Sequence, residues 1–170
     1  GIHVVRDDLL EGGTKRRLFT DYIKHFPNDK EFVYASPRQG YGQLALSLSC
    51  KDLGKSAVVF VPKGKRHQLT IDSEKYGAKI VEVPMGFLSN LNHKSKKYCE
   101  ENNSHLLPFG GDHPIIIESM SNLCKQIKVV PAEIWTVISS GVINRGLQNG
   151  FPNIKCYGVM IGHQTTKEEQ

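Results

Sequence analysis

Residues 31–61 read EFVYASPRQGYGQLALSLSCKDLGKSAVVFV, and this stretch decides the fold class. Short runs rich in β-branched and aromatic residues, 31–35 and 56–61, flank a segment with the apolar spacing of a helix, 43–53, which Gly54 closes. The apolar runs lack the strict alternation of a half-exposed strand, which indicates burial on both faces. A strand, a helix and a second buried strand predict a βαβ unit with parallel strands.

The same alternation continues on both sides of this unit. Further strands are expected at residues 3–5, 79–83, 105–107, 133–138 and 154–161, and further helices at 15–25, 67–76, 88–102, 113–128 and 142–148. Thr14 and Asp112 are the expected N-cap residues of the helices that follow them. The pattern predicts a three-layer α/β fold in which helices cover both faces of a mostly parallel, twisted sheet.

Length and composition favour a single compact α/β unit over residues 1–170. Within it we expect two sub-lobes, one formed by residues 1–30 plus 105–170 and the other by residues 31–104. The longest apolar runs, such as residues 57–61, are too short to span a bilayer, and the N-terminus lacks the apolar stretch of a signal peptide. We therefore expect a cytoplasmic protein with no membrane partner.

The cysteines point to a reducing compartment. The chain has four of them, Cys50, Cys99, Cys124 and Cys156, widely spaced and without a Cys-x-x-Cys pair. Such spacing is typical neither of a disulfide framework nor of a zinc site, so we expect free thiols and no bound metal.

The net charge of +5 favours anionic partners, either phosphorylated small molecules or nucleic acid. Basic residues gather locally at 15–17, 63–66 and 94–97, but they form no long stripe interleaved with aromatic residues. Nucleic acid is therefore left open as a partner without being indicated.

In parallel α/β sheets, ligands bind where strands end and helices begin. The first such segment, RDDLLEGGTKRRL at residues 6–18, places Lys15 at a helix start behind Gly12 and Gly13. The positive end of the helix dipole lowers the proton affinity of a lysine there, which makes its amine a better nucleophile toward an aldehyde. The alternative is an ordinary capped helix with surface cations.

Three later loops are also candidate ligand-binding segments. The amides of SPRQGYG at residues 36–42, together with Arg38, are suited to a carboxylate. The paired glycines of PFGGDHP at residues 108–114 permit close backbone approach to a ligand. Residues 139–146, SSGVINRG, follow the most apolar strand as a generic phosphate cradle and match neither a Walker A loop nor a dinucleotide fingerprint. The alternative for residues 36–42 is a simple tight turn, and for residues 108–114 a turn followed by a helix cap.

Taken in this order, the loops resemble those of the aminocyclopropane-carboxylate deaminase and D-cysteine desulfhydrase family. Residues 6–9 and 12–18 are similar to its Arg-Asp-Asp-Leu and Gly-Gly-Asn-Lys-x-Arg-Lys-Leu segment, and residues 107–114 to its Pro-x-Gly-Gly-Ser-x-Pro turn. Weaker matches lie at residues 76–80, 133–146 and 154–159. The resemblance implies a tryptophan-synthase-β-like fold, that of the fold type II pyridoxal enzymes.

The resemblance also implies pyridoxal 5'-phosphate as cofactor, with Lys15 as the catalytic residue that forms a Schiff base with its aldehyde. The implied cofactor-binding residues are Lys15, Gln39, Ser139, Ser140, Gly141, Val142, Ile143 and Asn144. The implied substrate-binding residues are Arg38, Gly40, Tyr41, Gly110 and Gly111. The expected reaction is deamination, elimination or decarboxylation of an amino acid or amine by a homodimer, with the cofactor as electron sink.

Some positions depart from that family. Ser139, Val142 and Ile143 stand where the family has Gly, Gly and Thr. The last part of the family's large lobe has no counterpart in this sequence, so we expect a C-terminally abbreviated chain: a minimal member, one completed by a partner chain, or a fragment. One alternative is therefore a pyridoxal enzyme acting on an amino-acid-modified nucleotide or on DNA, as in phage thymine hypermodification. A second alternative is a non-catalytic anion-binding module that keeps the fold.

Overall fold

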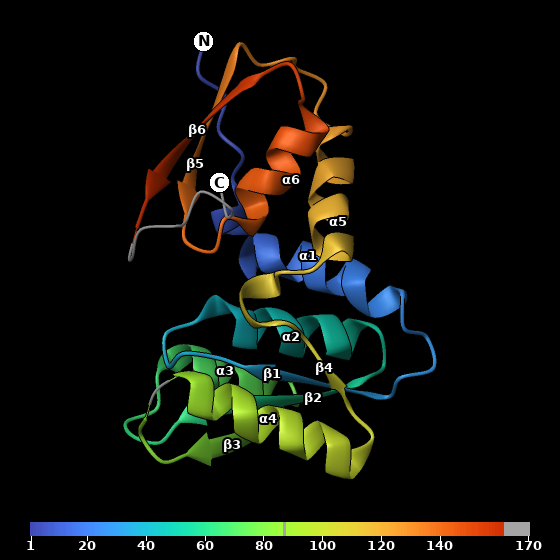
Figure 1. Cartoon of the computed structure of the whole chain (residues 1–170), viewed down its shortest axis with the longest axis vertical. Coiled ribbons are helices and arrows are strands. Elements are labelled where there is room, and N and C mark those ends of the chain that lie inside the picture. The colour runs from blue at the N-terminus through green and yellow to red at the C-terminus, as the bar shows by residue number, and fades with distance from the viewer. Residues whose placement is uncertain (87, 162–170) are drawn as a thin grey trace. The chain divides into compact units, whose positions relative to one another are not determined.

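The structure is a computed structural model that describes residues 1–86 and 88–161 (Figure 1). The chain separates into two compact units, Gly1–Phe109 and Gly110–Gln170. The expected grouping of residues 1–30 with residues 105–170 stays a prediction.

The first unit is built on a four-stranded sheet with the order β3-β2-β1-β4. Its strands are β1 (Glu31–Ala35), β2 (Ser56–Pro62), β3 (Lys79–Val83) and β4 (His105–Leu106). Every pairing is parallel, and Val33 lies opposite both Val58 and Leu106. The predicted parallel α/β arrangement is confirmed, and β1 and β3 have the predicted bounds.

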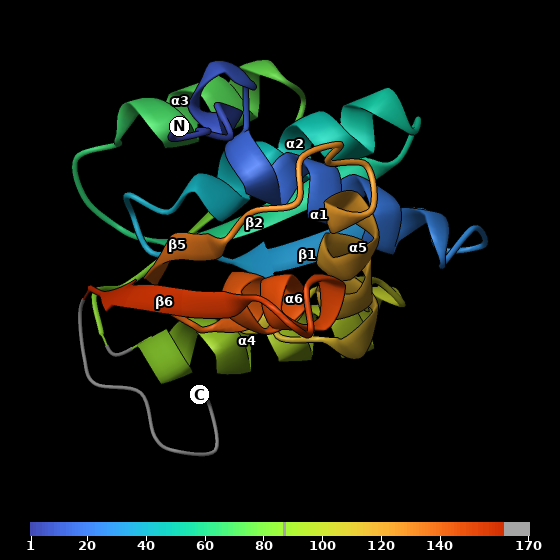
Figure 2. The ribbon, with the colours of Figure 1, turned by 90° about the horizontal axis from the view of Figure 1, so that it is seen from above.

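Helices cover both faces of this sheet (Figure 2). The helical elements are η1 (Asp7–Leu9), α1 (Gly13–Lys24), α2 (Tyr41–Asp52), α3 (Gln68–Lys75) and α4 (Leu88–Asn102). Helices α2 and α3 lie on one face and α4 on the other, where Leu91 and Cys99 pack against Val33, Val58 and Phe60. This gives the predicted three layers.

Helix α1 packs on the side of α2 that faces away from the sheet. Its apolar side chains, Leu18, Phe19, Tyr22 and Ile23, are all buried. The middle of α2 is consequently enclosed all round, with every residue from 42 to 50 buried. This explains why residues 42–50 are apolar or small apart from Gln43, as is typical of an internal helix.

The second unit contains α5 (Pro114–Cys124), β5 (Glu133–Ile138), α6 (Val142–Gly150) and β6 (Lys155–Met160), preceded by the short turn η2 (Phe109–Gly111). Strands β5 and β6 are parallel and form a sheet of their own. Helices α5 and α6 approach closely because Gly146 has no side chain: a Cβ there would lie 2.7 Å from Met120 Cγ.

Several local expectations were wrong. Residues 3–5 form no strand, because β-branched residues alone do not make one without a neighbour, and Val4 and Val5 are about 70% exposed. Gly12 rather than Thr14 is the N-cap of α1, and His113 rather than Asp112 caps α5, its ring accepting from the amide of Ile115.

Other chemical expectations concern cysteines, metals and membranes. All four cysteines are free thiols. Across residues 1–86 and 88–161 no group of three or more His, Cys, Asp or Glu side chains is arranged to hold a metal ion. In the same part of the chain, no helix combines the length and apolar character needed to cross a membrane.

Candidate functional site

Lys15 lies in the first turn of α1, directly behind a glycine turn. Gly12, the N-cap, has a left-handed backbone with φ +88°, and a Cβ there would lie 3.0 Å from Arg16 Cβ and 3.2 Å from Leu48 Cδ1. Any side chain at this position would be both strained and crowded. Gly12 therefore sets the point at which α1 starts, and with it the place of Lys15.

Both residues that follow Lys15 are held by ion pairs. Arg16 Nη2 lies 2.7 Å from Asp52 Oδ2 at the end of α2, and Arg17 Nε lies 3.2 Å from Asp7 Oδ1 in η1. Ser49 of α2 also donates from Oγ to the Arg16 carbonyl at 3.1 Å. The first turn of α1 is thus tied to two other elements.

Lys15 itself is half-buried, and burial lowers the pKa of its ammonium group. Desolvation by burial acts in the same direction as the effect expected from the helix dipole. A lowered pKa raises the fraction of neutral amine at a given pH, and only the neutral amine attacks an aldehyde. This site is suited to covalent attachment of a carbonyl compound.

The loop between β1 and α2 forms a tight turn that ends at an uncapped helix start. Ser36 is fully buried, and the Gly40 amide donates to the Pro37 carbonyl at 2.9 Å. Helix α2 begins at Tyr41, earlier than expected, and no side chain caps it. Free amides at a helix start form a generic site for a carboxylate.

Gln43 was missed by the sequence reasoning. It is buried, its Nε2 donates to the Arg38 carbonyl at 3.0 Å, and its Oε1 accepts from Thr70 Oγ1 at 2.8 Å. The side chain thereby joins the 36–40 loop to α3. A glutamine within an otherwise apolar or small helix segment was the available signal.

Arg38 reaches from this loop to the next one along the sheet. Its Nη2 donates to the Lys63 carbonyl at 3.1 Å, and its guanidinium occupies the space that a side chain at Gly64 would fill. Gln39, beside it, is exposed. Lys15, Arg38, Gln39, Gly40 and Tyr41, all predicted site residues, belong to the first unit.

In the second unit, the structure brings two of the predicted loops together. Gly110 has φ +71°, and a Cβ there would lie 3.2 Å from Ser140 Cβ. Arg145 Nη2 forms an ion pair with Asp112 Oδ1 at 2.7 Å, which joins the same two segments again. The predicted residues Gly110 and Ser140 are therefore neighbours.

The start of α6 has the features of an anion site. Its N-cap, Gly141, is left-handed with φ +76°, and no side chain caps the helix. Asn144 is buried, and its Oδ1, like Arg145 Nε, has no hydrogen-bond partner among the described residues. Because buried polar atoms are normally paired, these two groups point to a ligand that would satisfy them.

Comparison with known proteins places these observations in context. No protein-family model matches the chain. A curated relative, the glycyl-dTMP PLP-dependent decarboxylase of Pseudomonas phage M6, is 29% identical in a 134-residue alignment that covers 69% of this chain and 48% of the relative. The chain thus spans about half the length of the curated relative it matches.

Solved structures with the same fold include a threonine deaminase from T.th., at a TM-score of 0.78 and 20% identity over 91% of this chain and 52% of that one. An ACC deaminase homologue matches with a TM-score of 0.82 and 16% identity, over 95% of this chain and 55% of that one. A pyridoxal 5'-phosphate-dependent aspartate racemase matches with a TM-score of 0.74 and 20% identity, over 92% of this chain and 49% of that one. The chain therefore has the tryptophan-synthase-β-like fold of the fold type II pyridoxal-phosphate enzymes, over about half the length of those chains.

Proposed function

We propose that this chain binds pyridoxal 5'-phosphate through Lys15 and acts on an amino acid or amine by deamination, elimination or decarboxylation. The observation that carries the proposal is the half-buried Lys15, whose pKa is lowered by burial and whose neighbours Arg16 and Arg17 are each held by an ion pair. Perturbed lysines on a rigid frame are characteristic of functional sites. The fold it shares with enzymes of this class supports the same assignment.

The residues of the second unit fit the phosphate of this cofactor. The uncapped start of α6, which follows Ser139 and Ser140, offers the amides of Val142, Ile143 and Asn144. The unpaired Arg145 Nε is a donor, and rotation of the Asn144 amide would present a second one. Gly110 and Gly111 both have positive φ, and the missing side chain at Gly110 leaves the space beside Ser140 clear.

When bound, the cofactor supplies an electron sink for a carbanion at the α-carbon of the substrate. The chain's own residues bind and orient the cofactor and the substrate. Lys15 Nζ, with its lowered pKa, exchanges a proton more readily than an ordinary lysine amine. Arg38, Gly40 and Tyr41 stand at the start of α2, where a substrate carboxylate would meet free amides, and Gln39 is assigned to the cofactor side of the same loop.

The finer classification is part of the proposal. The segments at residues 6–18 and 107–114 support membership of the aminocyclopropane-carboxylate deaminase and D-cysteine desulfhydrase group. A cytoplasmic homodimer is the form we expect to be active. Gel filtration with light scattering, with and without the cofactor, measures that oligomeric state directly.

The cofactor assignment is tested by adding pyridoxal 5'-phosphate to the purified chain and recording the visible spectrum. We expect a visible absorption band that survives removal of unbound cofactor and is absent in Lys15→Ala. Lys24→Ala, at the other end of α1, is the matched control and should keep the band. Unaltered spectra in the wild-type chain would leave only the non-catalytic, anion-binding alternative.

A second candidate substrate is an amino acid attached to a nucleotide or to DNA. The specific observation that favours it is the curated relative, whose name describes a decarboxylase of glycyl-dTMP. The net charge of +5 suits a phosphorylated substrate. Release of carbon dioxide from glycyl-dTMP, compared with free glycine, distinguishes this candidate from a simple amino-acid enzyme.

A further inference from the structure

A cluster of cations lies at the carboxyl ends of the strands of the first unit. Arg38 follows β1, and Lys63 and Lys65 follow β2, which is hydrogen-bonded to β1 along the sheet. Arg38 is joined to this second loop through its hydrogen bond to the Lys63 carbonyl. We call Arg38, Lys63 and Lys65 the cationic cluster.

The charge of the cationic cluster is not neutralised by neighbours. Among the described residues, no carboxylate lies within ion-pair distance of any of its three members. The adjacent Arg66 behaves differently, because it pairs with Glu74 at 2.6 Å and with Glu82 at 2.9 Å. Glu74 and Glu82 therefore pair with Arg66 and not with the cationic cluster.

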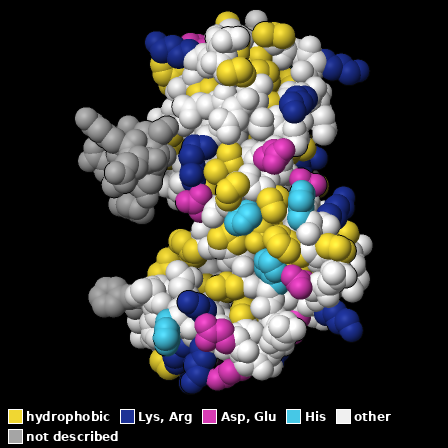
Figure 3. All heavy atoms as spheres, turned by 45° about the vertical axis from the view of Figure 1, so that its right-hand side comes forward, with side chains coloured by type: hydrophobic (Ala, Val, Ile, Leu, Met, Phe, Trp, Pro, Cys, Tyr) yellow, Lys and Arg dark blue, Asp and Glu magenta, His cyan; other side chains and the backbone are white. Residues whose placement is uncertain are grey.

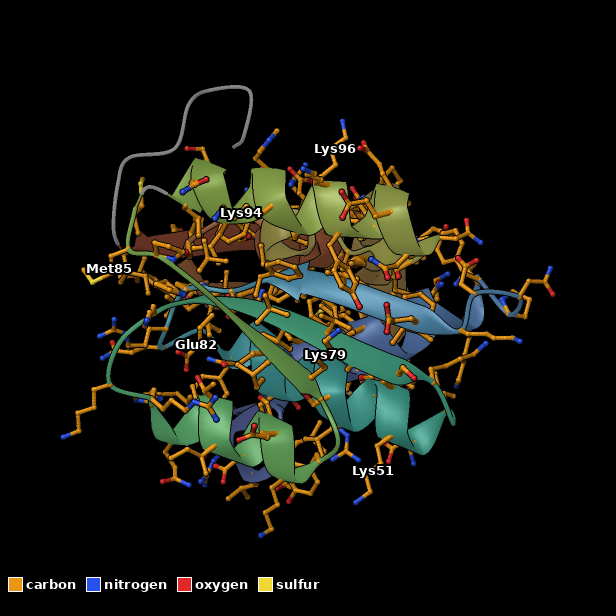
Figure 4. All side chains as sticks on the ribbon, turned by 90° about the horizontal axis from the view of Figure 1, so that it is seen from below. Lys51, Lys79, Glu82, Met85, Lys94 and Lys96 are labelled. Atoms are coloured by element: carbon orange, nitrogen blue, oxygen red, sulfur yellow. The ribbon has the colours of Figure 1, made fainter. Side chains whose placement is uncertain are left out.

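An aromatic ring and an uncapped helix start adjoin the cationic cluster. Tyr41, the first residue of α2, is 60% exposed although it begins a largely buried helix. Met85, which follows β3, is also exposed, and its sulfur lies 3.9 Å from Arg38 Nη2. Figure 4 shows Met85 and Lys79 at opposite ends of β3, which places Met85 at the carboxyl edge of the sheet. Arg38 and Met85 thus lie side by side, and the exposed Tyr41 begins the helix that follows at the same edge of the sheet.

We propose that the cationic cluster binds the phosphate of a nucleoside monophosphate that carries the amino-acid substrate, with the exposed ring of Tyr41 available to stack on the base. This inference rests on the second candidate substrate described above. Arginine and lysine donors form charge-assisted hydrogen bonds to phosphate, and aromatic rings stack on bases. Neither Lys63 nor Lys65 belongs to the residues assigned to the cofactor or to the substrate carboxylate. For this substrate Arg38 contacts the phosphate and Tyr41 the base, which leaves the amides at the start of α2 to the carboxylate.

The extent of the cationic cluster favours a mononucleotide over a nucleic acid. Nucleic-acid binding faces carry a stripe of many cations that follows the phosphate backbone. The basic residues of the chain gather locally, at 15–17, 63–66 and 94–97, rather than in one long run. Figure 3, which brings another face of the molecule forward, shows lysine and arginine side chains scattered among uncharged and acidic ones. Three clustered cations are sufficient for one phosphate monoester.

The test measures binding of dTMP by calorimetry, with thymidine and inorganic phosphate as partial ligands. We expect dTMP to bind more tightly than either, and Lys63→Ala/Lys65→Ala to weaken dTMP binding by about tenfold or more. The charge-matched control is Lys51→Ala/Lys96→Ala, because Figure 4 shows both side chains pointing outward from the first unit, away from Met85. Tyr41→Ala should weaken dTMP without affecting inorganic phosphate.

Failure of this inference is distinguishable from failure of the cofactor assignment. Lys15→Ala should lose the visible band of the bound cofactor and keep dTMP binding, while Lys63→Ala/Lys65→Ala should do the reverse. Equal dTMP affinity in the two double variants would overturn the inference. So would loss of the visible band in Lys63→Ala/Lys65→Ala, or tight binding of a thymidylate oligonucleotide by a chain that does not bind dTMP.

Discussion

Arg16 and Asp52 form an ion pair that ties the lysine-bearing helix α1 to the end of α2, with 2.7 Å between Nη2 and Oδ2. The two side chains are 23% and 45% exposed, so water screens part of their attraction. We expect Asp52→Asn to lower the free energy of unfolding by about 0.5–1 kcal/mol.

Urea unfolding of Arg16→Met, Asp52→Asn and the double variant measures this coupling in a double-mutant cycle. A positive coupling energy, together with a slower reaction of Lys15 with the cofactor, supports a role of the pair in holding α1. Strictly additive effects of the two substitutions would show that the pair contributes nothing.

Lys15 makes stability depend on pH. Because burial lowers its pKa in the folded chain, the unfolded chain holds the proton more tightly, and the charged form costs stability below the lowered pKa. That cost disappears as pH rises through the lowered pKa toward the ordinary value of lysine. We therefore expect Lys15→Met to be more stable than the wild type at neutral pH, with the difference closing at alkaline pH.

Thermal unfolding across this pH range, in the absence of cofactor, checks the Lys15 prediction. Lys24→Met is the control because it removes an exposed lysine from the same helix. A stability difference between Lys15→Met and the wild type that stays constant with pH would contradict the lowered pKa.

Gly110 is expected to be intolerant of a side chain for two separable reasons. Its φ of +71° strains any other residue by about 1 kcal/mol, and a Cβ would press on Ser140 at 3.2 Å. Gly54 has a similar φ of +64° but nothing within 4 Å, so Gly54→Ala isolates the strain. Both variants should lose stability, and only Gly110→Ala should also weaken cofactor binding.

Spectroscopic titration of each glycine variant with pyridoxal 5'-phosphate distinguishes these effects. Equal affinities of Gly110→Ala and Gly54→Ala for pyridoxal 5'-phosphate would show that the contact between Gly110 and Ser140 does not contribute to cofactor binding.

We expect the hydrogen bonds of Gln43 to hold the 36–40 loop in place. Gln43→Leu leaves the Arg38 carbonyl and the Thr70 hydroxyl without their buried partner, which costs about 2–3 kcal/mol. Adding Thr70→Val removes one of these stranded groups, so the double variant should lose less than the sum of the single ones. Chemical denaturation gives the three values, and an additive result would count against the shared network.

The secondary structure was predictable where the local signal and the tertiary setting agree. The bounds of β1, β3, α4 and β5 match the prediction. Strand β1 is an apolar run at buried positions, and the other three end next to residues typical of turns: Pro84, Asn103 and Ser139. Residues 3–5 also contain β-branched residues, but they have no neighbouring strand and form none themselves. Local propensity alone therefore did not determine the secondary structure there. The division of the strands between two sheets is a tertiary property that strand patterns do not contain.

The candidate site was likewise predictable from the sequence only in part. The glycine turn before Lys15 was visible in the sequence, since two adjacent glycines ahead of a helix mark a special backbone. The burial of Lys15, the ion pair of Arg16 with Asp52 and the contact of Gly110 with Ser140 depend on packing. Gln43 was missed because its burial and its two partners depend on packing, and the only local signal is a glutamine among apolar or small residues.

The central claim is that Lys15 is the residue to which the cofactor attaches. Its most direct test is to mix the chain with pyridoxal 5'-phosphate, reduce the adduct with borohydride, and map the labelled peptide by mass spectrometry. We predict that the phosphopyridoxyl label resides on Lys15 at close to one per chain. Label spread over exposed lysines such as Lys63 and Lys96, with none favoured, would contradict the account.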